Sequence, residues 1–141
     1  MTELLVAQGD PELQRRLSDE LDALNHAAIS SDDETPFSIR VLDAGGVLVG
    51  GLTGWTWGGC GGITSLWLDP EQRGRGLGRR LIAAAENEIR QRGCDRVVVA
   101  TMSFQAPGFY RCQGYEEVGV TPDMPDGTSK HHFFKRLPEP G

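Results

Sequence analysis

The feature that most constrains the fold is the run from Leu66 to Arg80, in which an apolar segment passes through a glycine-rich turn into a helical pattern. Glycines let the backbone approach a ligand closely, and the start of a helix presents unpaired N–H groups with a partial positive charge. Arginines surround this turn. The glycines are Gly74, Gly76 and Gly78, and the arginines are Arg73, Arg75, Arg79 and Arg80. The run therefore predicts a strand, a turn and a helix that together bind an anion.

Two nucleotide-binding motifs are excluded by the spacing. A Walker loop needs Gly-x-x-x-x-Gly-Lys followed by Ser or Thr, and no lysine is present in this run. A dinucleotide fingerprint that starts at Gly74 and Gly76 needs its third glycine at position 79, which is Arg79. The turn is therefore not explained by either class of nucleotide site.

A second motif follows the expected helix over residues 77–92 and the expected strand Arg96–Thr101. It has the pattern Ala, three residues, Tyr, three residues, Gly, Tyr, and its members are Ala106, Tyr110, Gly114 and Tyr115. With Arg73-x-x-Gly76-x-Gly78 before it, this order resembles the GNAT superfamily of N-acetyltransferases, over residues from about 37 to 137. Ser103 departs from the family pattern, because the family often has Asn at this position.

The resemblance implies an α/β (α+β) fold with a mixed, mostly antiparallel sheet of about six to seven strands, splayed in the middle and flanked by helices. It also implies acetyl-CoA as donor, with its pyrophosphate at the glycine-rich turn and its pantetheine arm between the strands 63–68 and 97–102. Whether the acyl group is acetyl or longer stays open. The residues expected to contact the donor are Leu66, Trp67, Leu68, Arg73, Gly74, Arg75, Gly76, Leu77, Gly78, Arg79, Ser103 and Tyr110.

The implied reaction needs two proton movements. A primary alkyl amine is an ammonium near neutral pH, because its pKa lies near ~10.4, so it must lose a proton before it attacks the thioester. The thiolate leaves more easily when an acid protonates it, and Tyr110 matches the family's general acid. A core aromatic residue with a hydrogen-bonded hydroxyl is the alternative interpretation of Tyr110. The N–H of Leu68 is expected to polarise the thioester carbonyl, a role worth about 3–4 kcal/mol in other enzymes.

The general base stays open. Asp69 precedes Pro70 and is suited to cap a turn, while Glu34 belongs to an acidic run. Adjacent histidines on a strand point to opposite faces, so such a pair does not bind one metal ion together. The candidates are Asp69, Glu34, His131, His132 and a chain of water molecules.

Charge is distributed unevenly along a chain of net charge −6. Residues 1–35 contain nine acidic residues and two arginines, whereas residues 73–96 contain seven arginines and three acidic residues. The basic segment suits the phosphates of coenzyme A. The acidic segment favours a cationic amine on a small molecule or a peptide, and improved solubility is its alternative explanation. Trp55 and Trp57 share one face of a strand, where they either line the acceptor site or pack in the core.

Two other classes of function stay in view. A non-catalytic acyl-CoA sensor would keep the glycine-rich turn and lose the acid, and the presence of Tyr110 argues against it. A nucleic-acid-binding domain built on the arginine-rich helix is disfavoured by the acidic net charge and by the lack of an aromatic and basic surface pattern. The family resemblance leaves a homodimer open.

Hydrophobic periodicity and turn residues predict the other elements. An amphipathic helix is expected over Pro11–Ile29, capped by Asp10, with leucines on one face at Leu13, Leu17, Leu21 and Leu24. A helix over 76–92 is expected to end at Gly93, and Leu77, Leu81, Ala84, Ala85 and Ile89 are expected to face the sheet. Turns are expected at Asp43–Gly46, Gly58–Gly62 and Thr121–Thr128, and a loop at Ser31–Pro36. Strands are expected at Leu4–Gln8, Phe37–Leu42, Val47–Trp57, Ile63–Leu68, Val97–Met102, Tyr115–Val120 and His131–Leu137.

Length and composition set the remaining expectations. A chain of 141 residues that is 38% apolar fits one domain, expected over residues 1–137, with a disordered tail at 138–141. No run approaches the ~20 apolar residues that span a bilayer, so we expect a cytoplasmic protein. The three cysteines, Cys60, Cys94 and Cys112, lack the spacing of a metal site, and no metal is expected.

Overall fold

The computed structural model describes residues 1–29 and 33–139 of the chain. The chain divides into two compact units, Met1–Asp33 and Glu34–Gly141. The extent of the expected single domain stays a prediction. Residues 140 and 141 of the expected disordered tail, like residues 31 and 32 of the expected loop, lie outside the described residues, and Pro138 and Glu139 have no regular secondary structure.

Among its described residues, the first unit has one helix, α1 (Pro11–Ala28). The Asp10 side chain accepts a hydrogen bond from the Leu13 N–H (2.9 Å), which confirms the expected cap. The four leucines of the predicted stripe are 50–63% exposed. The strand expected at Leu4–Gln8 is wrong: this segment pairs with no strand among the described residues, and without a partner an extended apolar segment has no backbone ladder to stabilise it.

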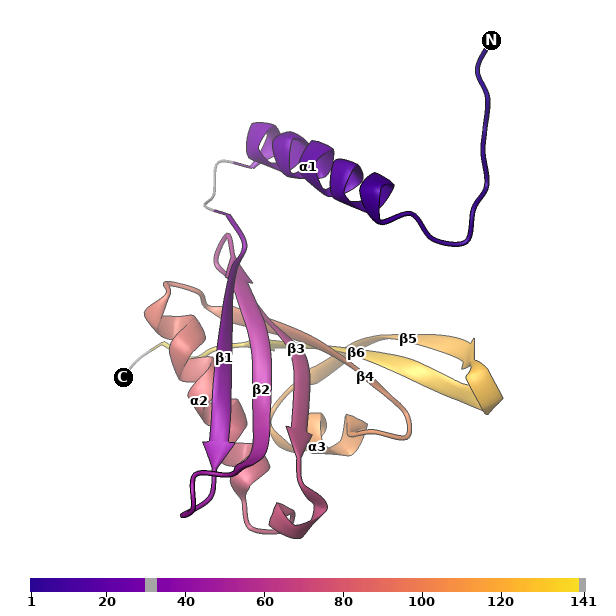
Figure 1. The fold of residues 1–141 in the computed structure, drawn as a ribbon. Coiled ribbons are helices and arrows are strands. Elements are labelled where there is room, and N and C mark those ends of the chain that lie inside the picture. The colour runs from indigo at the N-terminus through magenta and orange to yellow at the C-terminus, as the bar shows by residue number, and fades with distance from the viewer. Residues whose placement is uncertain (30–32, 140–141) are drawn as a thin grey trace. The chain divides into compact units, whose positions relative to one another are not determined.

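The described part of the second unit contains six strands and two α-helices, shown in Figure 1. Glycine and proline residues separate these elements, as the sequence indicates. Several helices and strands begin or end at residues other than the expected ones. The elements are β1 (Thr35–Leu42), β2 (Leu48–Trp57), β3 (Cys60–Leu68), α2 (Leu77–Gln91), β4 (Arg96–Met102), α3 (Pro107–Cys112), β5 (Glu116–Met124) and β6 (Thr128–Arg136), with 3-10 turns at Pro70–Gln72 and Pro125–Gly127.

The strands form one mixed sheet in the order β1-β2-β3-β4-β6-β5. Among the described strands, only β3 and β4 pair in parallel; the other neighbours are antiparallel. This arrangement confirms the expected α/β class and the mostly antiparallel sheet. The β1–β2 hairpin turns where expected, since Asp43 accepts hydrogen bonds from the N–H groups of Gly45 (2.8 Å) and Val47 (2.9 Å).

The start of β3 corrects the sequence prediction. The turn is limited to Gly58 and Gly59, both with positive φ, and Gly61 and Gly62 belong to the strand. A Cβ on Gly61 would lie 2.6 Å from Ile89, and a Cβ on Gly62 would collide with the Trp55 ring. These two glycines are therefore needed for close packing on both faces of the strand, and not for chain reversal.

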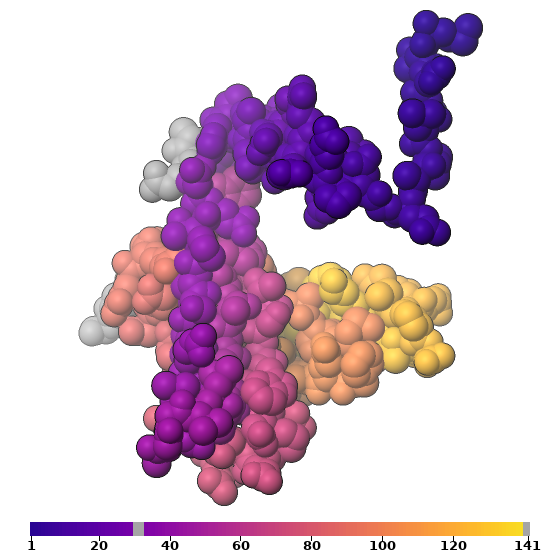
Figure 2. Space-filling model, viewed as in Figure 1, coloured from indigo at the N-terminus to yellow at the C-terminus, as the bar shows by residue number. Residues whose placement is uncertain are grey.

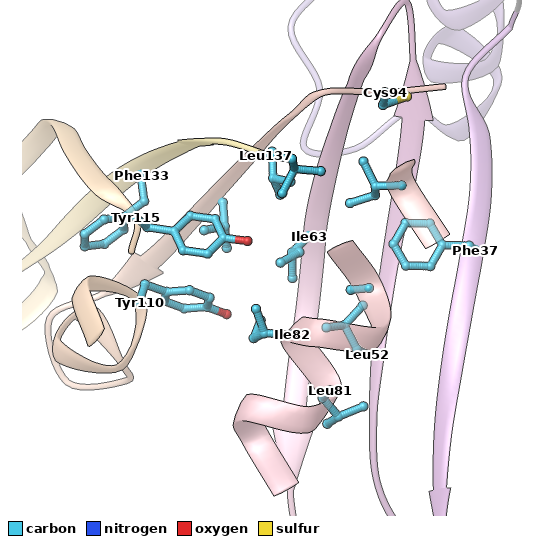
Figure 3. Close-up of a cluster of buried hydrophobic side chains, with 14 of the residues drawn as sticks. Phe37, Leu52, Ile63, Leu81, Ile82, Cys94, Tyr110, Tyr115, Phe133 and Leu137 are labelled. Atoms are coloured by element: carbon cyan, nitrogen blue, oxygen red, sulfur yellow. The ribbon is translucent and has the colours of Figure 1, made fainter. Parts of the chain in front are cut away.

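The core lies between the sheet and α2, with part of it shown in Figure 3. Leu81, Ala85 and Ile89 are buried as expected, but Ala84 is exposed. The buried face also includes Ile82 and Glu86, because the buried stripe of α2 is rotated by part of a turn from the predicted one. Glu86 is therefore a charged residue inside the core face.

The C-terminal hairpin is longer than expected. Strands β5 and β6 extend to the tight turn Pro125–Gly127, so most of the predicted loop is strand. In the space-filling view, α3 lies against this hairpin (Figure 2), and the Tyr110 and Phe133 rings are 6.0 Å apart. Within the described part of the chain, no helix is long and apolar enough to cross a membrane.

Candidate active site

A groove opens where β3 and β4 stop pairing. The two strands are joined only between Cys60–Ile63 and Arg96–Val99. Beyond this point β3 stays paired with β2 as far as Leu68, and β4 stays paired with β6 as far as Met102. The strands therefore separate, which confirms the splay, and they leave a groove of about 1000 Å³ lined also by the start of α2 and by α3.

The strand register determines which backbone groups face the groove. The Asp69 N–H donates to the Val49 carbonyl (2.8 Å), so this is a hydrogen-bonded antiparallel pair. Such pairs alternate with non-bonded pairs, so the N–H and C=O of Leu68 and Leu66 point away from β2, toward β4. By the same alternation, the N–H and C=O of Trp67 face β2, although Trp67 also lines the groove.

The first turn of α2 forms one end of the groove. Gly76 is its N-cap, with φ of 78° and no side-chain hydrogen bond to the first turn. Gly78 also lines the groove, and a Cβ there would lie 3.2 Å from the Phe109 ring of α3. These glycines leave the helix start open to a ligand, whose negative charge the helix dipole would stabilise.

The charged lining of the groove is basic. Arg73 and Arg79 line it, together with Gly74 and Leu77, but Arg75 does not. Its lining contains no carboxylate and no imidazole in the part of the chain that the structure describes. The groove therefore has the charge and the backbone donors that the phosphates of a nucleotide ligand need.

Tyr110 lies in the α3 wall of the groove and is only 5% exposed. Its ring packs edge-on against Phe109 and Tyr115, with centroids 5.3 and 5.7 Å away. Burial raises the pKa of Tyr110 above its ordinary value of 10, so the hydroxyl stays protonated at neutral pH. Figure 3 shows the Tyr110 and Tyr115 rings side by side, with their hydroxyls pointing the same way.

Ser103 does not line the groove, although the next three residues do. Its N–H donates to the Ser129 carbonyl (2.8 Å), and its hydroxyl accepts from the Ser129 N–H (3.1 Å). Through these two hydrogen bonds, Ser103 joins the end of β4 to β6. Its contact with pantetheine stays a prediction.

None of the four candidate bases lines the groove. Asp69 caps the Pro70–Gln72 turn by accepting from the Glu71 N–H (2.9 Å). His131 contacts Glu117 and Ser129, and His132 contacts Thr121 on the other face of the hairpin. Glu34 is exposed at the start of the second unit. Trp55 and Trp57 are half-buried and also lie outside the lining.

Several polar lining residues were missed by sequence reasoning. Thr64, Ser65, Gln72 and Gln113 all contribute to the groove. Gln72 directly precedes the glycine-rich turn, and Gln113 lies inside the Ala106–Tyr115 motif, so proximity to a motif was the available signal. Thr64 and Ser65 lie in the strand expected to flank the donor, but which of its residues reach the groove depends on where β3 separates from β4.

The chain matches the acetyltransferase (GNAT) family over residues 2–115. Blasticidin-S acetyltransferase of Streptomyces morookaense is 45% identical to it over 96 residues, which are 65% of this chain and 68% of that protein. An acetyltransferase of Agrobacterium fabrum is 30% identical over 128 residues, 91% of this chain and 93% of that protein. The crystal structure of an acetyltransferase from Bacillus cereus is 30% identical, with a TM-score of 0.86 over 95% of this chain and 98% of that chain.

The motif order, the splayed sheet and these similarities agree with one another. The chain therefore belongs to the GNAT family and is an N-acetyltransferase.

Proposed function

We propose that the groove binds acetyl-CoA and that the protein transfers the acetyl group directly to a primary amine of a small molecule in a ternary complex. The observation that carries this proposal is the separation of β3 from β4 after Ile63 and Val99. It opens a space that runs between the glycine-rich start of α2 and the buried hydroxyl-bearing residue Tyr110. One end suits an anion and the other suits acid catalysis.

The groove fits the donor in charge and in hydrogen-bonding capacity. Arg73, Arg79 and the first turn of α2 would hold the pyrophosphate, and the free backbone edge at Leu66 and Leu68 would bind the amide groups of pantetheine. A Bacillus anthracis protein with the same fold was solved in complex with acetyl coenzyme A; its TM-score to this chain is 0.64 at 18% identity.

The chemistry follows from two groups of the chain. The Leu68 N–H would donate to the thioester oxygen as negative charge develops there during attack by the amine nitrogen. As the C–N bond forms and the C–S bond breaks, the Tyr110 hydroxyl would donate its proton to the departing sulfur. The amide and coenzyme A are the products, and solvent restores the tyrosine proton.

The amine proton is proposed to pass to water. The described lining of the groove contains no carboxylate or imidazole that could accept it directly. Of the bases considered, this favours the chain of water molecules over Asp69, Glu34, His131 and His132. The rate at limiting amine should then rise with pH as the free amine is formed.

The acceptor is proposed to be a cationic small molecule. The relative that is 45% identical is named blasticidin-S acetyltransferase. This name supports a small-molecule acceptor here. The net charge of −6 favours a positively charged amine over a neutral one.

The test is a panel of amines mixed with acetyl-CoA, with release of free thiol as the readout. Acceptor-dependent thiol release is expected, and Tyr110→Phe should lower kcat by about 10²- to 10⁴-fold with little change in KM for acetyl-CoA. Unchanged kcat in that variant would refute the acid role. Tight binding of acetyl-CoA without turnover on any amine would favour a sensor instead.

A further inference from the structure

An ionic cluster of Glu86, Tyr115 and Lys135 joins α2, the segment after α3 and β6, outside the groove lining. Glu86 of α2 is 6% exposed, and its carboxylate accepts a hydrogen bond from the Tyr115 hydroxyl (2.8 Å). The Lys135 ammonium lies 3.1 Å from both carboxylate oxygens and 5.3 Å from the Tyr115 ring centroid. A buried carboxylate is costly unless it is paired and hydrogen-bonded, and here it is both.

The same cluster holds the C-terminal end of α3. Lys135 donates to the Gln113 carbonyl (2.8 Å). The N–H groups of Gln113 and Tyr115 donate to the Tyr110 carbonyl, at 3.1 and 3.0 Å. Tyr110 is therefore linked to Glu86 by two routes, one through Tyr115 and one through Lys135 and Gln113.

The helix that carries Tyr110 depends on such contacts. It has six residues and no side-chain cap at its N-terminus. A helix this short is not stable by itself in water, so packing and hydrogen bonds from other elements determine its orientation. Phe133 of β6, whose ring centroid lies 6.0 Å from that of Tyr110, and the Glu86 cluster supply these restraints.

We propose that Glu86 is a positioning residue for acetyl transfer: through Tyr115 and Lys135 it fixes the end of α3, so that the Tyr110 hydroxyl is aimed at the leaving sulfur. This inference rests on the proposed acid role of Tyr110 and extends it. Glu86 itself does not line the groove, so its expected effect is on the position of Tyr110 and hence on kcat, with donor binding unchanged.

The first test is Glu86→Gln, which keeps the side-chain shape and removes the charge. We expect kcat to fall about tenfold, as misplacement of a catalytic group by a fraction of an ångström would cause, with KM for acetyl-CoA unchanged. The matched control is Glu88→Gln on the same helix, where the carboxylate is 39% exposed and pairs with Arg92. That variant should keep wild-type kcat. Unchanged kcat in Glu86→Gln, or an equal loss in both variants, would overturn the proposal.

A double-mutant cycle separates positioning from general destabilisation. In a Tyr110→Phe background, Glu86→Gln should lower kcat by less than about twofold, because no acid remains to be misplaced. Equal fold-losses in the two backgrounds would overturn the positioning role and leave the acid role intact. Unchanged kcat in Tyr110→Phe alone would refute the acid role itself. If Glu86→Gln does not fold, Tyr115→Phe, which removes one hydroxyl, replaces it in the same cycle.

Discussion

Alanine at Gly76 should weaken coenzyme A binding far more than alanine at Gly93, although both changes strain the same helix equally. Gly76 begins α2 with φ of 78°, and Gly93 follows its end with φ of 83°. A Cβ at Gly93 meets nothing within 4 Å, and one at Gly76 meets only the end of Arg79 at 3.8 Å. The cost of alanine is therefore conformational at both sites, about 1–2 kcal/mol.

The two variants should differ in their affinity for coenzyme A, because only one of the two glycines lines the groove. Gly76 lines the groove, so its methyl group would hold a phosphate away from the first turn of α2. Loss of one charged hydrogen bond is worth about 1.5–3 kcal/mol, which is about 10- to 100-fold in Kd. Gly93 lies at the other end of the helix and should leave Kd unchanged.

Thermal unfolding and calorimetric titration with coenzyme A measure the two effects separately. Both variants should lose about 3–10 °C in Tm without ligand. Only Gly76→Ala should lose the further stabilisation that coenzyme A gives the wild type. Equal Kd values in the two variants would refute the assignment of the pyrophosphate to the start of α2.

Two further predictions concern charged side chains. Arg79→Gln should raise the Kd for coenzyme A by about tenfold, whereas Arg75→Gln should leave it nearly unchanged, because Arg79 lines the groove and Arg75 does not. Calorimetric titrations at one ionic strength test this, and equal changes in Kd for the two variants would contradict it. Hydrogen bonds from His131 and Arg111 hold the pKa of Glu117 below its ordinary value of 4.5. Glu117 therefore stabilises the fold above pH 4.5 and loses this effect as the pH falls through its lowered pKa. The Tm of Glu117→Gln should thus decline less than that of the wild type from about pH 5 to pH 3; parallel declines would count against this linkage.

Local sequence predicted the elements whose signals are themselves local. The Asp10 cap, the Asp43–Gly46 turn and the stop of α2 before Gly93 each depend on residues within one turn, and all three are present. The strand expected at Leu4–Gln8 failed because a strand depends on a partner elsewhere in the chain. Gly61 and Gly62 were misassigned to a turn for a similar reason: their role depends on Ile89 and Trp55, which are distant in sequence.

The groove was predictable in outline because its glycine- and arginine-rich part is contiguous in the sequence. Glycine and arginine spacing identified the start of α2, and the family motif identified Tyr110. Which arginines reach the groove was not predictable, since Arg75 and Arg79 have the same chemistry and differ only in direction. The backbone groups at Leu66 and Leu68 also required the strand register, because alternation decides which N–H points where.

The amino-acid sequence was enough to predict a glycine-rich helix start, a tyrosine on a short helix and the family to which the chain belongs. Only the folded chain shows where β3 and β4 separate and which groups surround Tyr110. Glu86 lies far from Tyr115 and Lys135 along the chain, and nothing in its local pattern indicates a buried partner. Burying the Glu86 carboxylate costs free energy unless it is paired, and Lys135 and Tyr115 provide its partners. These partners can be recognised only once the core is formed.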